Sequence, residues 1–242
     1  GLFYFYSCKQ KRPNTEQNFK LKTTFERSEG KATSTYAEMM AFYKAADQYA
    51  DNLKMIEHQT TDSGLPLHVV TYRNGPKNKN QLQLLINNGI HPGEPDGIDA
   101  SMLMLRNIIN RKIDIPDHLV LHIIPAYNIG GMLDRNSNSR ANQNGPQAYG
   151  FRGNARNYDL NRDFIKMDTD NMRAFANIYH NLDPDVYVET HVSNGADYQY
   201  TLTHLLSQHD RLGHQMGEYV DQTFKPLLES SIRDKDLLIT PY

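Results

Sequence analysis

The fold is decided by one stretch of the chain, Leu82-Gln-Leu-Leu-Ile-Asn87, which runs directly into Asn88-Gly-Ile-His-Pro-Gly-Glu-Pro-Asp96. The first part is a short apolar run, which is typical of a buried β-strand. Beyond the turn, apolar residues recur at helical spacing, at Ile98, Met102, Leu105 and Ile109. This spacing predicts an amphipathic helix with Asp96 as its N-cap. A strand, a tight turn and a helix in this order indicate an α/β domain with a site where the strand ends.

Other parts of the chain continue the α/β pattern. Short apolar or β-branched runs predict three more strands, at Leu67–Tyr72, Leu119–Ile124 and Val186–Thr190. Helical spacing predicts one helix over Tyr36–Asp51 and a long one from Leu205 to Phe224. The unbroken apolar character of the strand at 119–124 indicates a sheet that is covered on both faces.

Size and composition limit the classes of function. A chain of 242 residues is long enough for one sizeable domain, so we expect one active site. The formal net charge of −2 offers no field that would attract nucleic acid or an anionic membrane. The mean hydropathy is −0.68, and no run reaches the roughly 18 apolar residues of a membrane-spanning helix. We therefore expect no nucleic-acid partner.

The N-terminal segment indicates export. Gly1-Leu-Phe-Tyr-Phe-Tyr-Ser-Cys8 is apolar and then turns polar, which resembles a secretory signal peptide that meets a bacterial lipoprotein cysteine. The alternative is that Cys8 is an ordinary free thiol. We expect a secreted or cell-envelope protein of a bacterium, with residues 1–34 as signal-peptide remnant and polar tether. Because Cys8 is the only cysteine, a disulfide framework and a thiolate zinc site are excluded.

His91 and Glu94 are candidate metal ligands. They stand three residues apart directly after a predicted strand, and the Pro-Gly between them favours a tight turn over a helix. On their own they could be a surface turn. His191 also ends an apolar strand, and strand ends of one sheet can converge on one ion. Zinc accepts imidazole nitrogen and carboxylate oxygen, and its catalytic sites take three protein ligands. His122, on a predicted strand, is interpreted as a core or flanking residue.

A long polar loop covers Asp134 to Tyr158 and is rich in Asn, Arg, Gly and Ser. Loops of this length inside a compact domain are usually functional or disordered. Arginines in such a loop beside a sheet favour a functional loop. For Arg152, Arg156 and Arg162 the alternative is a solvated loop face.

Three motifs in order resemble the zinc metallocarboxypeptidases of the carboxypeptidase A superfamily, peptidase family M14, in a bacterial form. They are His91-Pro-Gly-Glu94, Arg152-Gly-Asn-Ala-Arg-Asn-Tyr-Asp-Leu-Asn-Arg-Asp163 and Glu189-Thr-His191. The resemblance implies one catalytic α/β domain, residues 35–242, with a mixed, largely parallel β-sheet flanked by helices on both faces. It also implies that the domain's C-terminal part is missing. The implied activity is zinc-dependent hydrolysis, by an activated water, of the C-terminal peptide bond of a peptide with a free carboxylate.

The resemblance implies roles around the metal. His91, Glu94 and His191 match the ligands of one Zn²⁺ per chain. Asp159 matches the acidic residue that hydrogen-bonds the ring of the first zinc histidine and thereby fixes its tautomer.

The resemblance also implies how the substrate is held. Asn161 and Arg162 match the pair that binds the terminal carboxylate. Arg152 matches the arginine that polarises the scissile carbonyl and stabilises its oxyanion, a catalytic role.

The match is incomplete at the general base. In the family this glutamate lies farther beyond the third ligand than the chain extends, so we expect it to be missing here. Glu189 shares a strand face with His191 and is interpreted as a residue near the metal or the pocket wall, with a catalytic role as the alternative. Two other functions stay open. One is an amidohydrolase or deacylase of the same superfamily that acts on peptidoglycan peptides or N-acyl amino acids, and the other is a non-catalytic, peptide-binding envelope protein.

Overall fold

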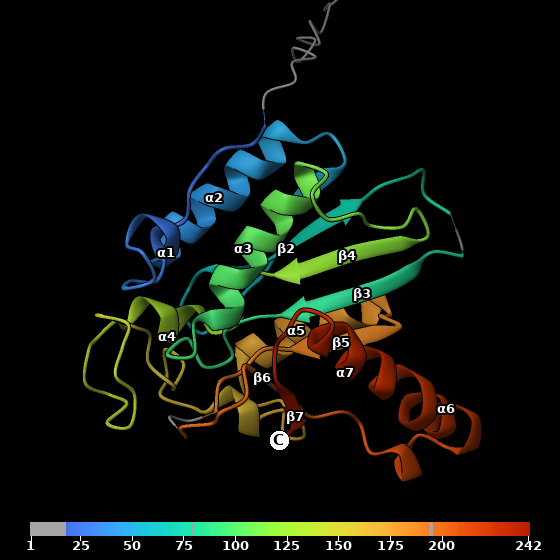
Figure 1. Cartoon of the computed structure of the whole chain (residues 1–242). Coiled ribbons are helices and arrows are strands. Elements are labelled where there is room, and N and C mark those ends of the chain that lie inside the picture. The colour runs from blue at the N-terminus through green and yellow to red at the C-terminus, as the bar shows by residue number, and fades with distance from the viewer. Residues whose placement is uncertain (1–17, 79, 194–195) are drawn as a thin grey trace, which may run out of the picture. The chain divides into compact units, whose positions relative to one another are not determined.

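The computed structural model describes residues 18–78, 80–193 and 196–242. The chain divides into two compact units (Figure 1). Among the described residues, the first unit comprises residues 18–78, 80–139 and 145–191, and the second comprises residues 140–144, 192–193 and 196–242. Every residue that the sequence predicts to hold or surround a metal belongs to the first unit.

The first unit is built on a mixed five-stranded sheet. Its strands are β1 (Leu53–Thr60), β2 (Pro66–Arg73), β3 (Leu82–Asn87), β4 (Leu119–Ile124) and β5 (Val186–Glu189). Their order across the sheet is β1-β2-β4-β3-β5, and the pairs β1/β2 and β2/β4 are antiparallel while β4/β3 and β3/β5 are parallel. The four strands that the sequence predicts are therefore confirmed, each to within one residue at either end.

Helices cover both faces of the sheet, as expected (Figure 1). The helices α2 (Tyr36–Tyr49) and α3 (Asp96–Ile109) pack on one face, and α5 (Asp170–Leu182) packs on the other. Neighbouring residues of β2 point to opposite faces, because Val70 belongs to the core under α2 and α3 and Val69 to the core under α5. Burying a side chain of this size contributes about 1.5–3 kcal/mol.

Residues 18–34 belong to the first unit and pack into its core, which differs from the expected domain boundary after residue 34. Phe19 is only 7% exposed and belongs to the core under α2 and α3. The short helix α1 (Thr24–Arg27) carries Glu26, whose carboxylate lies 2.6 Å from the guanidinium of Arg106 on α3. The polar composition of this segment therefore reflects specific partners and not a tether. The predicted signal-peptide remnant and Cys8 lie outside the described residues.

Two local features differ from the sequence prediction. The N-cap of α3 is Pro95 and makes no side-chain cap hydrogen bond, while Asp96 is the first helical residue. There its negative charge faces the positive end of the helix dipole. The strand β1 was not predicted, because it is an edge strand in which only Leu53 is buried, so its sequence has too few apolar residues to form a pattern.

The second unit contains a small parallel sheet and a helical segment. The strand β6 (Leu202–His204) pairs with β7 (Ile239–Pro241). The 3₁₀ turn η2 (His209–Arg211) is followed by α6 (His214–Tyr219), the π-helical turn η3 (Val220–Phe224) and α7 (Lys225–Arg233). The helix expected from Leu205 thus begins only at His214, because Gly213 has a φ of 82°, a left-handed conformation that interrupts a helix.

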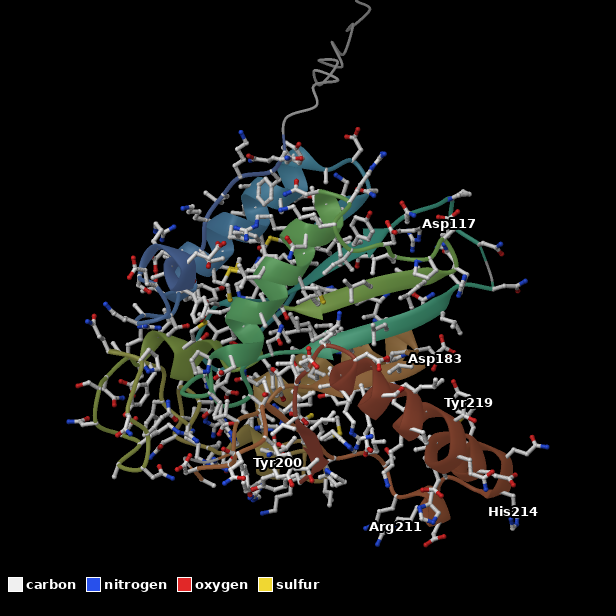
Figure 2. The ribbon with its side chains drawn as sticks, in the orientation of Figure 1. Asp117, Asp183, Tyr200, Arg211, His214 and Tyr219 are labelled. Carbon is white, nitrogen blue, oxygen red and sulfur yellow. The ribbon has the colours of Figure 1, made fainter. Side chains whose placement is uncertain are left out.

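The side chains on this helical segment are largely exposed. Figure 2 shows Arg211, His214 and Tyr219 projecting from the ribbon, and Tyr219 is 52% exposed. Leu205 and Met216, whose spacing suggested the long helix, are also exposed. Among the described residues, no helix is long and apolar enough to cross a membrane.

The sheet topology decides where a site can form. Strands β3 and β5 are parallel neighbours, with Asn87 of β3 opposite Glu189 of β5. Their carboxyl ends therefore meet at one edge of the sheet. The helix α4 (Ile129–Leu133) follows β4 on the same edge, and the 3₁₀ helix η1 (Leu160–Arg162) lies in the segment between β4 and α5.

Candidate metal centre

His91 and Glu94 lie in a buried turn after β3. Gly89 begins the turn with a φ of 67°, and a Cβ there would lie 2.9 Å from Cδ1 of Ile98. The turn closes through a hydrogen bond of 2.9 Å, which the amide of Glu94 donates to the carbonyl oxygen of His91. Both residues are 2% exposed. The two side chains thus come from a tight turn, as predicted.

The side chains of His91, Glu94 and His191, here called the metal triangle, converge. The Glu94 carboxylate lies between two imidazoles, with Oε1 3.2 Å from Nδ1 of His91 and Oε2 2.8 Å from Nδ1 of His191. One ligand atom from each residue lies within 4.8 Å of the others. The hydrogen bond with Glu94 raises the pKa of His191 above its ordinary value, although burial acts in the opposite direction.

The metal triangle fits zinc. Two imidazole nitrogens and one carboxylate oxygen form a ligand set that catalytic zinc sites use, with a further position left for water or substrate. The Glu94 side chain is 1% exposed, and a buried carboxylate requires a compensating positive charge. The His191 side chain is 33% exposed, so the site remains accessible from its side.

Asp159 holds the far side of the His91 ring. Its Oδ1 lies 2.9 Å from Nε2 of His91 and accepts the amide hydrogen of Asn161 at 3.0 Å. Burial opposes ionisation of Asp159, but the hydrogen bond with His91 and the charge of Arg152 outweigh it, and its pKa lies below its ordinary value. A carboxylate on Nε2 keeps the hydrogen there and leaves Nδ1 to face a metal. This is the contact that the resemblance implies for Asp159, and its effect on metal binding stays a prediction.

Arg152 borders the metal triangle. Its Nε and Nη2 each lie 3.0 Å from Oδ2 of Asp159. Its Nη1 lies 3.4 Å from Nδ1 of His91 and 3.9 Å from Oε1 of Glu94. The Arg152 side chain is 39% exposed, so it faces both the triangle and solvent. A guanidinium in this place can stabilise negative charge that develops on a bound substrate.

Asn161 and Arg162 lie in η1, whose N-cap is Asp159. Arg162 is exposed, and its Nη1 donates to the carbonyl oxygen of Asn161 at 2.8 Å. Their backbone position places them next to Asp159, and their role in carboxylate binding stays a prediction.

A further set of residues, missed from the sequence, anchors the loop at residues 152–159. Asp62 follows β1, and its side chain is 1% exposed. Its carboxylate accepts hydrogen bonds from Nδ2 of Asn154 at 3.2 Å, from Nη1 of Arg156 at 3.3 Å and from the amide of Asn171 on α5 at 3.2 Å. In the sequence Asp62 indicates only a turn, because its partners lie about a hundred residues away along the chain.

Glu189, at the end of β5, also faces the metal triangle. Its Oε1 lies 3.8 Å from Nε2 of His191. Burial raises the pKa of Glu189 above its ordinary value, although the charge of His191 opposes the shift. The sequence prediction that Glu189 and His191 share a face is confirmed.

A model of the peptidase family M14, described as zinc carboxypeptidase, matches residues 39–202 of the 242 residues. The match covers more than half of the chain and includes the metal triangle, Arg152 and η1. No curated protein sequence matches the chain.

Solved structures share this fold at low sequence identity. A metallo-carboxypeptidase from Burkholderia cenocepacia is 19% identical with a TM-score of 0.56, and the alignment covers 68% of this chain and 43% of that one. A metallo-carboxypeptidase from Pseudomonas aeruginosa, solved with (2-guanidinoethylmercapto)succinic acid, is 16% identical with a TM-score of 0.50. That alignment covers 67% of this chain and 41% of the other. Bovine thrombin-activatable fibrinolysis inhibitor, solved with tick carboxypeptidase inhibitor, is 13% identical with a TM-score of 0.62. That alignment covers 87% of this chain and 76% of the other. The chain spans less than half the length of the two bacterial proteins.

Proposed function

Because this chain belongs to the zinc carboxypeptidase family, we propose that the full-length protein is a metallocarboxypeptidase that removes the C-terminal residue from peptides. The observation that carries the proposal is the convergence of His91, Glu94 and His191, whose ligand atoms lie within 4.8 Å of one another. These three side chains would hold one zinc ion. When bound, zinc supplies a Lewis acid that activates water and polarises a carbonyl group.

Arg152 is the proposed oxyanion-stabilising residue. Its Nη1 lies 3.4 Å from Nδ1 of His91, beside the atoms that would hold the metal. The charge that it would meet develops only as the carbonyl is attacked, so its contribution lowers the activation barrier more than it tightens substrate binding. Asp159 contacts both His91 and Arg152 and so orients the two side chains together.

Asn161 and Arg162 are proposed to bind the terminal carboxylate of the substrate. The exposed guanidinium of Arg162 stands three residues after Asp159, the N-cap of η1, and Asp159 also holds His91. A guanidinium pairs with a carboxylate through two parallel hydrogen bonds. Such a contact would restrict cleavage to a chain end, because only a chain end carries the free carboxylate.

We further propose that the protein works in the cell envelope of a bacterium or outside the cell, with Cys8 as a lipid anchor. The support is the apolar segment before Cys8 and the polar one after it. Metabolic labelling with a fatty-acid analogue should mark the wild-type protein and leave a Cys8→Ser variant unmarked. Equal labelling of the two proteins, or none of either, would contradict the anchor.

Two peptides that differ only at the C-terminus, one a free acid and one an amide, test the activity. The zinc-loaded, full-length protein should cleave the acid and reject the amide, because Arg162 would then face a neutral group. Equal turnover of both peptides would contradict the proposal and favour a deacylase or amidohydrolase. Binding of the acid peptide without turnover would favour a non-catalytic peptide-binding protein.

Metal analysis tests the ligand assignment independently of the substrate. Purified wild-type protein should contain close to one zinc ion per chain, and a His91→Ala/His191→Ala double variant should lose it. His180→Ala is the matched control, because His180 is an exposed histidine of α5. Metal content in the double variant equal to that of the control would refute the assignment.

A further inference from the structure

Glu189 stands beside the metal triangle with an unused acceptor atom. It is the last residue of β5, and its backbone is paired with Asn87 of β3. Within the described part of the chain, the buried Oε1 of Glu189 has no hydrogen-bond partner. A buried acceptor without a partner costs about 1–3 kcal/mol, so this oxygen requires a donor.

The ring nitrogen Nε2 of His191 can donate a hydrogen bond to this oxygen. Glu189 ends β5 and His191 follows it by two residues, so both side chains can lie on the same side of the chain. The Oε1 atom lies 3.8 Å from Nε2 of His191. This distance is longer than a hydrogen bond, and a small rotation of the flexible glutamate side chain would shorten it to one.

The two histidines of the triangle are flanked in the same way. Nδ1 of His91 faces Glu94, and its Nε2 faces Asp159. Nδ1 of His191 also faces Glu94, and its Nε2 faces Glu189. Each imidazole therefore lies between the shared ligand carboxylate and an outer carboxylate of its own.

An outer carboxylate has a defined effect on a metal-binding histidine. Only one ring nitrogen of a neutral imidazole carries hydrogen, and the nitrogen without it binds the metal. An acceptor at Nε2 keeps the hydrogen there, orients the ring and increases the basicity of Nδ1. Removal of such an acceptor typically weakens metal binding by about 10- to 100-fold.

We propose that Glu189 is the positioning residue of His191: its carboxylate accepts the Nε2 hydrogen of His191 and holds Nδ1 toward the metal. The inference rests on the proposed metal centre and deepens it. It distinguishes Glu189 from a general base, which would act on the attacking water and leave metal affinity unchanged. Because β5 is paired along its length with β3, the carboxylate stands on a rigid element, as a positioning group must.

Zinc affinity, measured by competition with a chelator, tests the proposal in the full-length protein. Glu189→Ala should weaken zinc binding by about 10- to 100-fold. Glu189→Gln should restore most of the affinity, because the amide oxygen can still accept from Nε2. Val186→Ala is the matched control, because Val186 is an exposed residue of the same strand. Asp159→Ala provides the benchmark for loss of the corresponding carboxylate at His91.

A spectroscopic readout separates positioning from a loss of general stability. In ¹⁵N NMR spectra of the zinc form, the Nε2 hydrogen of His191 should exchange slowly with solvent in the wild-type protein and in Glu189→Gln, where an acceptor binds it, and rapidly in Glu189→Ala. Zinc affinity of Glu189→Ala equal to that of Val186→Ala would overturn the positioning role, and a fall in turnover without any change in affinity would overturn it in favour of a general base. A wild-type protein that binds no zinc would overturn the proposed metal centre and the inference together.

Discussion

Acidification should destabilise the protein through one buried histidine, His122 in the centre of the sheet. His122 is 3% exposed. Its Nδ1 lies 2.8 Å from Oγ1 of Thr71, and its Nε2 lies 2.9 Å from Oε1 of Gln83. The Gln83 amide is oriented by its own hydrogen bond to the carbonyl oxygen of Gln81. The imidazole therefore donates through Nε2 and accepts through Nδ1, which is the pattern of a neutral ring.

The size of the effect follows from the pKa. Burial, assisted by the charge of Arg73, lowers the pKa of His122 from 6.5 to about 4. Because the unfolded chain binds the proton more tightly than the folded one, stability is complete above about pH 6.5 and is lost as the pH falls toward 4. Each unit of pKa corresponds to about 1.4 kcal/mol, so the loss at pH 4 is about 3 kcal/mol.

Urea unfolding at several pH values between about 7 and 4 measures this loss as a change in the free energy of unfolding. Other groups also titrate in this range, so the comparison is with His122→Gln, which lacks the buried imidazole. The variant should be less stable than wild type at neutral pH and should show a shallower decline on acidification, by about 3 kcal/mol. An exposed histidine changed in the same way, His180→Gln, should leave the wild-type slope intact. Parallel slopes for wild type and His122→Gln would refute the reasoning.

Three further outcomes are expected in the full-length protein. Arg152→Ala should lower kcat by about 10²–10³-fold, whereas Arg162→Ala should mainly raise KM, because only Arg152 meets charge that forms during the reaction. Equal effects of the two variants on kcat would contradict these roles. Asp62→Ala should destabilise the protein by about 1–3 kcal/mol in chemical unfolding and lower kcat, because three hydrogen-bond donors lose their buried acceptor. Unchanged stability would contradict the role of Asp62 in anchoring the loop at residues 152–159. Gly97→Ala should lower the free energy of unfolding by about 1–3 kcal/mol, because a Cβ at this position of α3 would lie 2.1 Å from Oγ1 of Thr190. An unfolding midpoint equal to that of wild type would show that this contact can relax.

Local pattern in the sequence was sufficient for most of the sheet and for the first two ligands. Four of the five strands, β2 to β5, are apolar or β-branched runs, and such runs indicate buried strands. Residues 18–34 and β1 escaped prediction because their partners are distant residues and not a local period. The helix expected from Leu205 failed for the opposite reason, since its apolar spacing belongs to exposed side chains.

By itself, the sequence determined which residue types follow β3 and β5, because the turn built on Gly89 and Pro92 and the apolar run just before His191 are local features. Only the tertiary structure decided that these ends meet. The reason is the strand order, in which β3 is hydrogen-bonded on one side to β4 and on the other to β5, so that segments about a hundred residues apart become neighbours. The same pairing brings the Oε2 atom of Glu94, after β3, to 2.8 Å from Nδ1 of His191, after β5. Pairing of this kind depends on the packing of the whole sheet, which no local periodicity encodes.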